Sequence, residues 1–168
     1  MRYRYKLHRI IDKDKSPHVL FIGLNPSEAT ELLGEGGKND PTISKLIRMV
    51  GNWHGSKYGG FYVGNIFPVV ETKSENLPKL IQMIPEDCMR ENIKALKEMK
   101  DKCDLVVFCW GARGNIDKKR KEEILEMFPD GHHLGKPTSN HQPRHPLYQS
   151  ERTTPEPYRT SQLIKPSR

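Results

Sequence analysis

The sequence lacks the features that mark membrane-spanning, secreted and cysteine-ligated metal proteins. Its longest apolar run is six residues, at positions 105–110, whereas a membrane-spanning helix needs about 18 or more. Residues 1–6 are basic and aromatic with no apolar stretch behind them, so no signal peptide is expected. The three cysteines form no Cys-x-x-Cys pair, which argues against a disulfide framework, a zinc site or an iron–sulfur cluster. We therefore expect a reduced, cytoplasmic protein with no metal or cofactor.

The length and charge indicate one soluble domain with a basic balance. The chain has 168 residues, enough to bury a core without disulfides. Lys and Arg number 28 against 21 Asp and Glu, which gives a formal net charge of +7. A positive charge favours a polyanionic partner, because Lys and Arg release counterions from phosphates. Many soluble domains are equally basic, so the charge by itself does not establish nucleic-acid binding.

The apolar patterning predicts an α/β domain over residues 1–148. Short continuous apolar runs are typical of parallel strands buried on both faces, and segments with helical periodicity separate them. This alternation predicts a four-stranded, mostly parallel sheet in a three-layer α/β/α arrangement. Residues 149–168, rich in Pro, Arg and Ser, are expected to form a poorly ordered tail. The expected elements are an edge strand at residues 2–7, strands at 18–24, 61–67, 104–110 and 131–134, and helices beginning at Pro41, Glu86 and Asp117.

Polar residues or sharp turns follow the expected strands where each strand ends. Because the carboxyl ends of parallel strands meet at one edge of a sheet, where ligands bind in such folds, these residues are expected to form one site. They are Asn25 and Pro26 after the first strand, Asn65 at the end of the second, Trp110 at the end of the third, and residues 141–148 after the fourth.

The local patterns leave two interpretations open for each of these residues. The amide of Asn25 could hold a water molecule, or it could shape the loop as an Asx-turn. Asn65 could read the carbonyl and ring N–H of a pyrimidine, or it could cap a strand. Trp110 could stack on a base, although a place in the core is favoured. Asp40 could be a carboxylate of the site, although its position before Pro41 favours a helix N-cap.

The segment at residues 141–148 combines two histidines, two prolines and an arginine. Its histidines could polarise or protonate a leaving group. Arg144 could clamp a phosphate, and Leu147 or Tyr148 could wedge into a base stack. Two further histidines stand at residues 132–133, but the spacing fits no standard metal site, so no metal is expected.

Five separated motifs occur in order along the chain and together resemble a known family. They resemble the domain of unknown function 1643, a family of short bacterial and phage proteins, over nearly the whole length from residue 2 to residue 148. A more distant similarity links the same segments to the uracil-DNA glycosylase superfamily. The motifs are Gly-Leu-Asn-Pro-Ser at 23–27, Asn-Asp-Pro-Thr at 39–42, Tyr-Val-Gly-Asn-Ile-Phe at 62–67, Trp-Gly-Ala at 110–112 and Arg-His-Pro-Leu-Tyr at 144–148.

The resemblance implies a uracil-DNA glycosylase-like fold and an enzyme that hydrolyses the N-glycosidic bond of uracil or a modified pyrimidine in DNA. Such an enzyme would belong to DNA repair or modified-base metabolism. Asn25 would orient the attacking water in a loop shaped by proline. The base would be bound by Asn65, Pro26 and Trp110. A histidine of the last motif region, His141 or His145, would stabilise the departing base.

The resemblance also implies contacts with DNA and leaves two points open. Arg144 and Ser27 would contact phosphates, and Leu147 and Tyr148 would enter or flank the helix. Gln142 stands where the related short proteins have a histidine before proline, so either His141 or His145 could act.

Two alternatives to a DNA glycosylase remain at this stage. One is a non-catalytic module that binds a base, a nucleotide or a DNA end in the same pocket. The other is a hydrolase of free nucleosides or nucleotides. In each case we expect a monomer that does not bind membranes.

Overall fold

The computed structural model describes residues 1–27 and 39–158 of the chain. In these residues, one sheet of six strands is accompanied by four α-helices. The strands are β1 (Leu7–Ile10), β2 (His18–Gly23), β3 (Gly60–Asn65), β4 (Leu105–Phe108), β5 (His132–Leu134) and β6 (Pro155–Pro157). The helices are α1 (Pro41–Asn52), α2 (Leu77–Gln82), α3 (Glu86–Lys100) and α4 (Lys118–Met127).

The sheet is mixed, with the strand order β1-β3-β2-β4-β5-β6. Its four central strands, β3, β2, β4 and β5, are parallel, and the edge strands β1 and β6 are antiparallel to their neighbours. The sheet therefore has six strands where a four-stranded sheet was predicted; of the two antiparallel edge strands, the first was expected, at residues 2–7, and β6 was not. The first edge strand also begins later than predicted, because residues 2–4 pair with residues 68–70 through a single bridge at Tyr3 and Val69.

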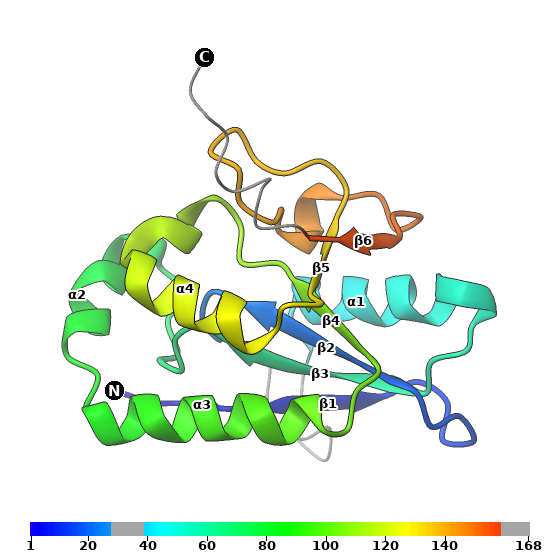
Figure 1. The fold of residues 1–168 in the computed structure, drawn as a ribbon, viewed down its shortest axis with the longest axis horizontal. Helices are drawn as coiled ribbons and strands as arrows, with labels where there is room; N and C mark the ends of the chain where they lie inside the picture. The colour runs from blue at the N-terminus through cyan, green and yellow to red at the C-terminus, as the bar shows by residue number, and fades with distance from the viewer. Residues whose placement is uncertain (28–38, 159–168) are drawn as a thin grey trace.

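Helices cover both faces of the sheet, as the continuous burial of residues 19–22 in β2 requires. Leu20 and Ile22 belong to one hydrophobic cluster, which they share with Leu96 of α3 and with residues of α2 and α4. Val19 and Phe21 point to the other face and pack in a second cluster with the apolar side of α1. Figure 1 shows α3 and α4 together on one face of the sheet. The general α/β prediction is confirmed.

The helix starts follow from the capping residues in the sequence. Asp40 Oδ1 accepts a hydrogen bond from the backbone N–H of Ile43 at 2.8 Å, and Pro41 occupies the first turn, as predicted. The helix predicted at Glu86 begins there and ends at Lys100. The described residues contain no helix that is long and apolar enough to cross a membrane.

Residues 149–158 are packed against the domain, although they were predicted to belong to a poorly ordered tail. β6 pairs with β5, and Tyr158 is buried beside Phe108. The indole N–H of Trp53 donates to the backbone oxygen of Thr153 at 2.8 Å. The prolines misled the prediction, because an edge strand tolerates prolines whose missing N–H faces away from the sheet. Residues 159–168 of the predicted tail lie outside the described residues.

Two histidines meet at the end of the sheet where β2 and β3 begin. His8 Nε2 lies 3.1 Å from His18 Nε2, and the His8 ring stacks on Tyr62 at 4.1 Å between centroids. His18 Nδ1 lies 2.8 Å from the Ser16 carbonyl oxygen. Because a carbonyl can only accept, Nδ1 of His18 carries the hydrogen, and Nε2 of neutral His18 accepts from His8.

The fold is expected to lose stability as the pH falls below 6.5, the ordinary pKa of histidine. Burial lowers the pKa of both His8 and His133 below 6.5 in the folded chain. The unfolded chain therefore binds more protons than the folded chain as the pH falls through this range, so stability decreases. We predict a lower melting temperature at pH 5.5 than at pH 7.5, measured by circular dichroism. His8→Phe, which keeps an aromatic ring beside Tyr62, should reduce this pH dependence. An unchanged pH dependence would contradict the assignment of part of the acid sensitivity to His8.

Candidate functional site

A cleft of about 530 Å³ lies at the carboxyl edge of the parallel strands. The segments after β2, β3 and β4 contribute to it, together with the start of α1 and the 3₁₀-helix at Pro146–Tyr148. This is the edge at which the sequence predicted a site. Of the residues predicted for the site, the cleft is lined by Asn25, Ser27, Asn65, Trp110, His145, Leu147 and Tyr148.

Asn65 places an unpartnered amide in the wall of this cleft. The residue is only 4 % exposed, and its side chain makes no hydrogen bond within the described residues. Its position is fixed through the backbone, because Asn92 Nδ2 donates to the Asn65 carbonyl oxygen at 2.9 Å. Gly23 is required beside it, since a Cβ there would lie 2.7 Å from Asn65 Oδ1. The polar atoms of this amide are not among the fully buried, unpartnered side-chain atoms of the described residues, so they remain accessible from the cleft and to a ligand there.

Asn25 clamps the end of β2 to the segment that follows β3. Its Nδ2 lies within hydrogen-bond distance of three backbone oxygens, those of Pro26 at 3.1 Å, Val69 at 3.2 Å and Glu71 at 2.9 Å. Pro26 is buried, and its carbonyl oxygen also accepts from the Glu71 N–H. The amide hydrogens of Asn25 are thus used within the fold, and only Oδ1 remains for a ligand or water.

Asp40 is a cleft residue, although the sequence favoured a helix cap over a carboxylate of the site at this position. While Oδ1 caps α1, Oδ2 accepts a hydrogen bond from Ser27 Oγ at 2.6 Å, and both residues line the cleft. The capping prediction is confirmed but incomplete. The signal that was given too little weight is the acidic residue in the 39–42 motif. Ser or Asn would cap the helix equally well, so capping alone does not account for an Asp at this position.

His145 is the histidine that the structure brings into the cleft. Its Nδ1 accepts a hydrogen bond from the Leu147 N–H at 3.2 Å, so the neutral ring carries its hydrogen on Nε2. Burial lowers the pKa of His145 below 6.5, against an opposing effect of Asp40, and Lys45 lowers it further. The ring is therefore a neutral donor at pH 7, and Nε2 has no partner among residues 1–27 and 39–158.

Three residues predicted for the site stand outside the cleft lining: Pro26, His141 and Arg144. His141 occupies a turn with a positive φ of 63°, and its carbonyl oxygen accepts from Tyr158 Oη at 3.2 Å. Arg144 donates to the backbone oxygens of Lys136 at 3.0 Å and Pro137 at 3.3 Å. The sequence could not separate His141 from His145 because the two differ only in how the loop folds.

Trp110 belongs mainly to the core, as the sequence favoured. Only 2 % of the residue is exposed, and its ring lies 4.9 Å from that of Phe108 between centroids. Its Nε1–H donates to Gln142 Oε1 at 3.0 Å. Gln142 thus secures the loop that carries His145, and little of the indole face is left for a base.

Two apolar side chains stand exposed where the cleft opens. Leu147 is 45 % exposed and Tyr148 is 77 % exposed, both on the 3₁₀-helix that follows His145. Lys45 Nζ secures this helix by donating to the backbone oxygens of Leu147 and Gln149. Exposed rings and leucines beside a cleft are suited to contact a flat apolar partner such as a nucleobase.

The charged residues that line the cleft are balanced. Among the described residues, Arg4 and Arg113 provide positive charge, and Asp40 and Glu71 provide negative charge. The expected basic phosphate clamp at Arg144 is not part of this lining. No group of three or more His, Cys, Asp or Glu in the described residues could hold a metal ion.

The comparison with protein families places the chain in one family. The family model described as "Protein of unknown function (DUF1643)" matches residues 4–147. The chain belongs to this family. No curated protein and no solved structure gives a significant match. All the cleft residues of this DUF1643 protein except Tyr148 lie within the matched range.

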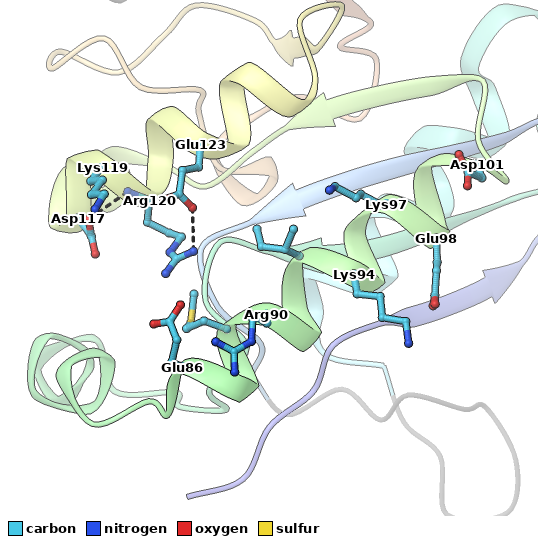
Figure 2. A pocket seen from close by; sticks show the side chains of 12 residues that line it. Glu86, Arg90, Lys94, Lys97, Glu98, Asp101, Asp117, Lys119, Arg120 and Glu123 are labelled. Atoms are coloured by element: carbon cyan, nitrogen blue, oxygen red, sulfur yellow. Dashed lines mark hydrogen bonds and ion pairs between the residues drawn. The ribbon is translucent and has the colours of Figure 1, made fainter.

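The DUF1643 domain has a second, larger groove between α3 and α4, of about 690 Å³. Figure 2 shows Arg120 and Glu123 of α4 and Glu86 of α3 at the space between the helices, while Lys94 and Glu98 point away from α4. Arg120 and Glu123 form an ion pair at 2.8 Å. Charges that satisfy one another on exposed helices are common, so the Asn65 amide, which lines its cleft without a hydrogen-bond partner in the described residues, is the stronger indication of a binding site.

The three carbonyl oxygens around Asn25 explain why an amide stands at this position. In Asn25→Asp, a carboxylate oxygen would face oxygens that now accept hydrogen bonds, so those contacts become repulsive. We predict a loss of about 2 kcal/mol or more of unfolding free energy, or a melting temperature lower by about 4–8 °C. Asn76→Asp, at an exposed site without a side-chain cap bond, is the matched control for charge. Equal melting temperatures in the two variants would contradict the clamp.

Proposed function

We propose that this protein hydrolyses the N-glycosidic bond between the sugar and a uracil-like or modified pyrimidine base in DNA. The proposal is supported by three groups that line one cleft: the unpartnered amide of Asn65, the neutral donor Nε2–H of His145, and the free Oδ1 of Asn25.

The buried amide of Asn65 is the observation on which the proposal mainly rests. A side-chain amide presents a donor and an acceptor side by side, which matches the adjacent carbonyl and ring N–H of a pyrimidine. Since Asn65 is 4 % exposed and lacks a partner in the described residues, a base that fills this place would complete its hydrogen bonds. A base must leave the stack to reach such a pocket, at a cost of a few kcal/mol that is least for damaged or unpaired bases.

His145 supplies stabilisation for the leaving base. When the bond between the sugar carbon and the base nitrogen breaks, its electron pair passes to the base, which becomes an anion. The Nε2–H of neutral His145 donates to a carbonyl oxygen of that anion and stabilises the developing charge. The lowered pKa of His145 keeps this donor neutral at pH 7.

The exposed rim favours a polymeric substrate. Leu147 and Tyr148 stand beside the cleft opening, where they would occupy the space left by an extruded base or stack on its neighbour. Base stacking on aromatic side chains is worth about 1–3 kcal/mol per base.

The balanced charge of the cleft favours a second candidate, the hydrolysis of free nucleosides or nucleotides. Asp40 and Glu71 could accept hydrogen bonds from sugar hydroxyls, and Arg4 and Arg113 are too few for a long phosphate track. Salt distinguishes the two substrates, because DNA affinity falls steeply with salt concentration and nucleoside affinity does not.

Base release is the test of this proposal. The protein is incubated with single- and double-stranded oligonucleotides that contain uracil, hydroxymethyluracil or a thymine mismatch, and free base is measured by mass spectrometry. We expect release by the wild type and a loss of 100-fold or more in kcat/KM in Asn65→Ala, which removes both hydrogen bonds to the base. Asn76→Ala is the control at an exposed position.

The other outcomes have definite meanings. Release from free nucleosides but not from DNA would favour the second candidate. Salt-sensitive DNA binding with no release would indicate a non-catalytic binding module. Equal release by the wild type and Asn65→Ala would refute the role of Asn65.

A further inference from the structure

Two side chains of the cleft, those of Asn25 and Asp40, could act on the attacking water. They differ in whether they can take up a proton. Asn25 has its amide hydrogens directed at three backbone oxygens, and an amide cannot take up a proton at neutral pH. Asp40 is a carboxylate in the lining of the same cleft. When water attacks, it must give up a proton to a nearby group. A carboxylate can accept that proton, whereas an amide cannot.

The carboxylate of Asp40 is oriented by two hydrogen bonds and retains acceptor capacity. Oδ1 accepts from the backbone N–H of Ile43 at 2.8 Å, and Oδ2 accepts from Ser27 Oγ at 2.6 Å. An ionised carboxylate has about four acceptor positions, so these two bonds leave room for a water molecule. The carboxylate also stands at the N-terminus of the 12-residue helix α1, where the helix dipole favours negative charge.

The capping function does not explain why this residue is acidic. Asn and Ser cap helices as well as Asp does, and neither would place a charge in the cleft. The negative charge of Asp40 acts on His145, whose pKa it raises against the effects of burial and Lys45. Glu71, Arg4 and Arg113 are the other charged residues in the described lining.

We propose that Asp40, and not Asn25, accepts the proton of the attacking water. This inference rests on the proposed N-glycosidic hydrolysis. The water oxygen forms a bond to the sugar carbon as the carbon–nitrogen bond breaks with its electron pair going to the base. The water proton passes to Asp40 and is then returned through solvent to the base anion, so the products are the free base and a hydroxyl on the sugar. Asn25 Oδ1 orients the same water as an acceptor only.

The charge of Asp40 also contributes before the proton moves. Glycosidic bonds break through a transition state in which positive charge develops on the sugar ring. A carboxylate beside the sugar stabilises this charge, while His145 stabilises the opposite charge on the base. The two groups therefore act on opposite ends of the breaking bond.

Asp40→Asn separates the two functions of this residue. Asn retains the acceptor that caps α1, so the melting temperature should remain close to that of the wild type. Removing the charge and the proton acceptor should lower kcat by at least about 100-fold with little change in oligonucleotide affinity. Asp40→Ser, a second capping residue, should behave in the same way. Asp130→Asn removes an exposed carboxylate outside the cleft lining and should retain activity within about threefold of the wild type.

An independent measurement reports on Asp40 without activity. The pKa of His145 is measured by NMR titration in the wild type and in Asp40→Asn. Loss of the carboxylate should lower this pKa, since Asp40 raises it in the wild type. An unchanged pKa would show that the carboxylate does not face the histidine and would overturn the proposed arrangement.

The kinetic outcomes separate this inference from the function on which it rests. Base release by the wild type with near-normal release by folded Asp40→Asn would overturn the role of Asp40 and leave the glycosylase proposal standing. A loss in Asp130→Asn as large as that in Asp40→Asn would overturn the assignment, because the effect would then not be specific to the carboxylate in the cleft. Absence of release by the wild type would overturn both proposals together.

Discussion

The hydrogen bonds of Asn25 hold the cleft together. By binding three backbone oxygens, its amide ties the end of β2 to residues 69–71, which follow β3. The backbone N–H of Ile66 donates to Gly23 O at 2.9 Å and reinforces the same junction. Without this clamp, the segments after β2 and β3 would be joined by backbone hydrogen bonds alone, such as the one from the Glu71 N–H to the Pro26 oxygen.

The cleft combines features that usually oppose one another. Asn65 is almost wholly buried and His145 is half-buried, yet the Asn65 amide and the Nε2–H of His145 lack partners among the described residues. The surrounding structure tolerates this because Gly23 makes room for the amide and Gln142 secures the loop through Trp110. Groups kept unsatisfied by a rigid frame are preorganised for a ligand, and preorganised dipoles are the main source of electrostatic stabilisation in enzymes.

The sequence predicted the central strands, the starts of α1 and α3, and the sheet edge at which the cleft lies, because strand burial and helix capping are local signals. It did not predict β6, since prolines at residues 155 and 157 are read as loop unless the partner strand is known. The sequence favoured the capping function of Asp40 over a place in the site because capping is visible locally, whereas the position of Asp40 in a cleft depends on long-range contacts. The choice between His141 and His145 likewise depended on the fold of one loop.

The central claim is that the buried amide of Asn65 is the group that binds a pyrimidine base. The most direct test is to titrate uracil into ¹⁵N-labelled protein and to follow the side-chain amide resonances by NMR. The account predicts that the Asn65 side-chain resonances shift with saturation, while those of Asn92, which donates to backbone oxygens, shift much less. Shifts confined to the groove between α3 and α4, or no shift of the Asn65 resonances at saturating uracil, would contradict it.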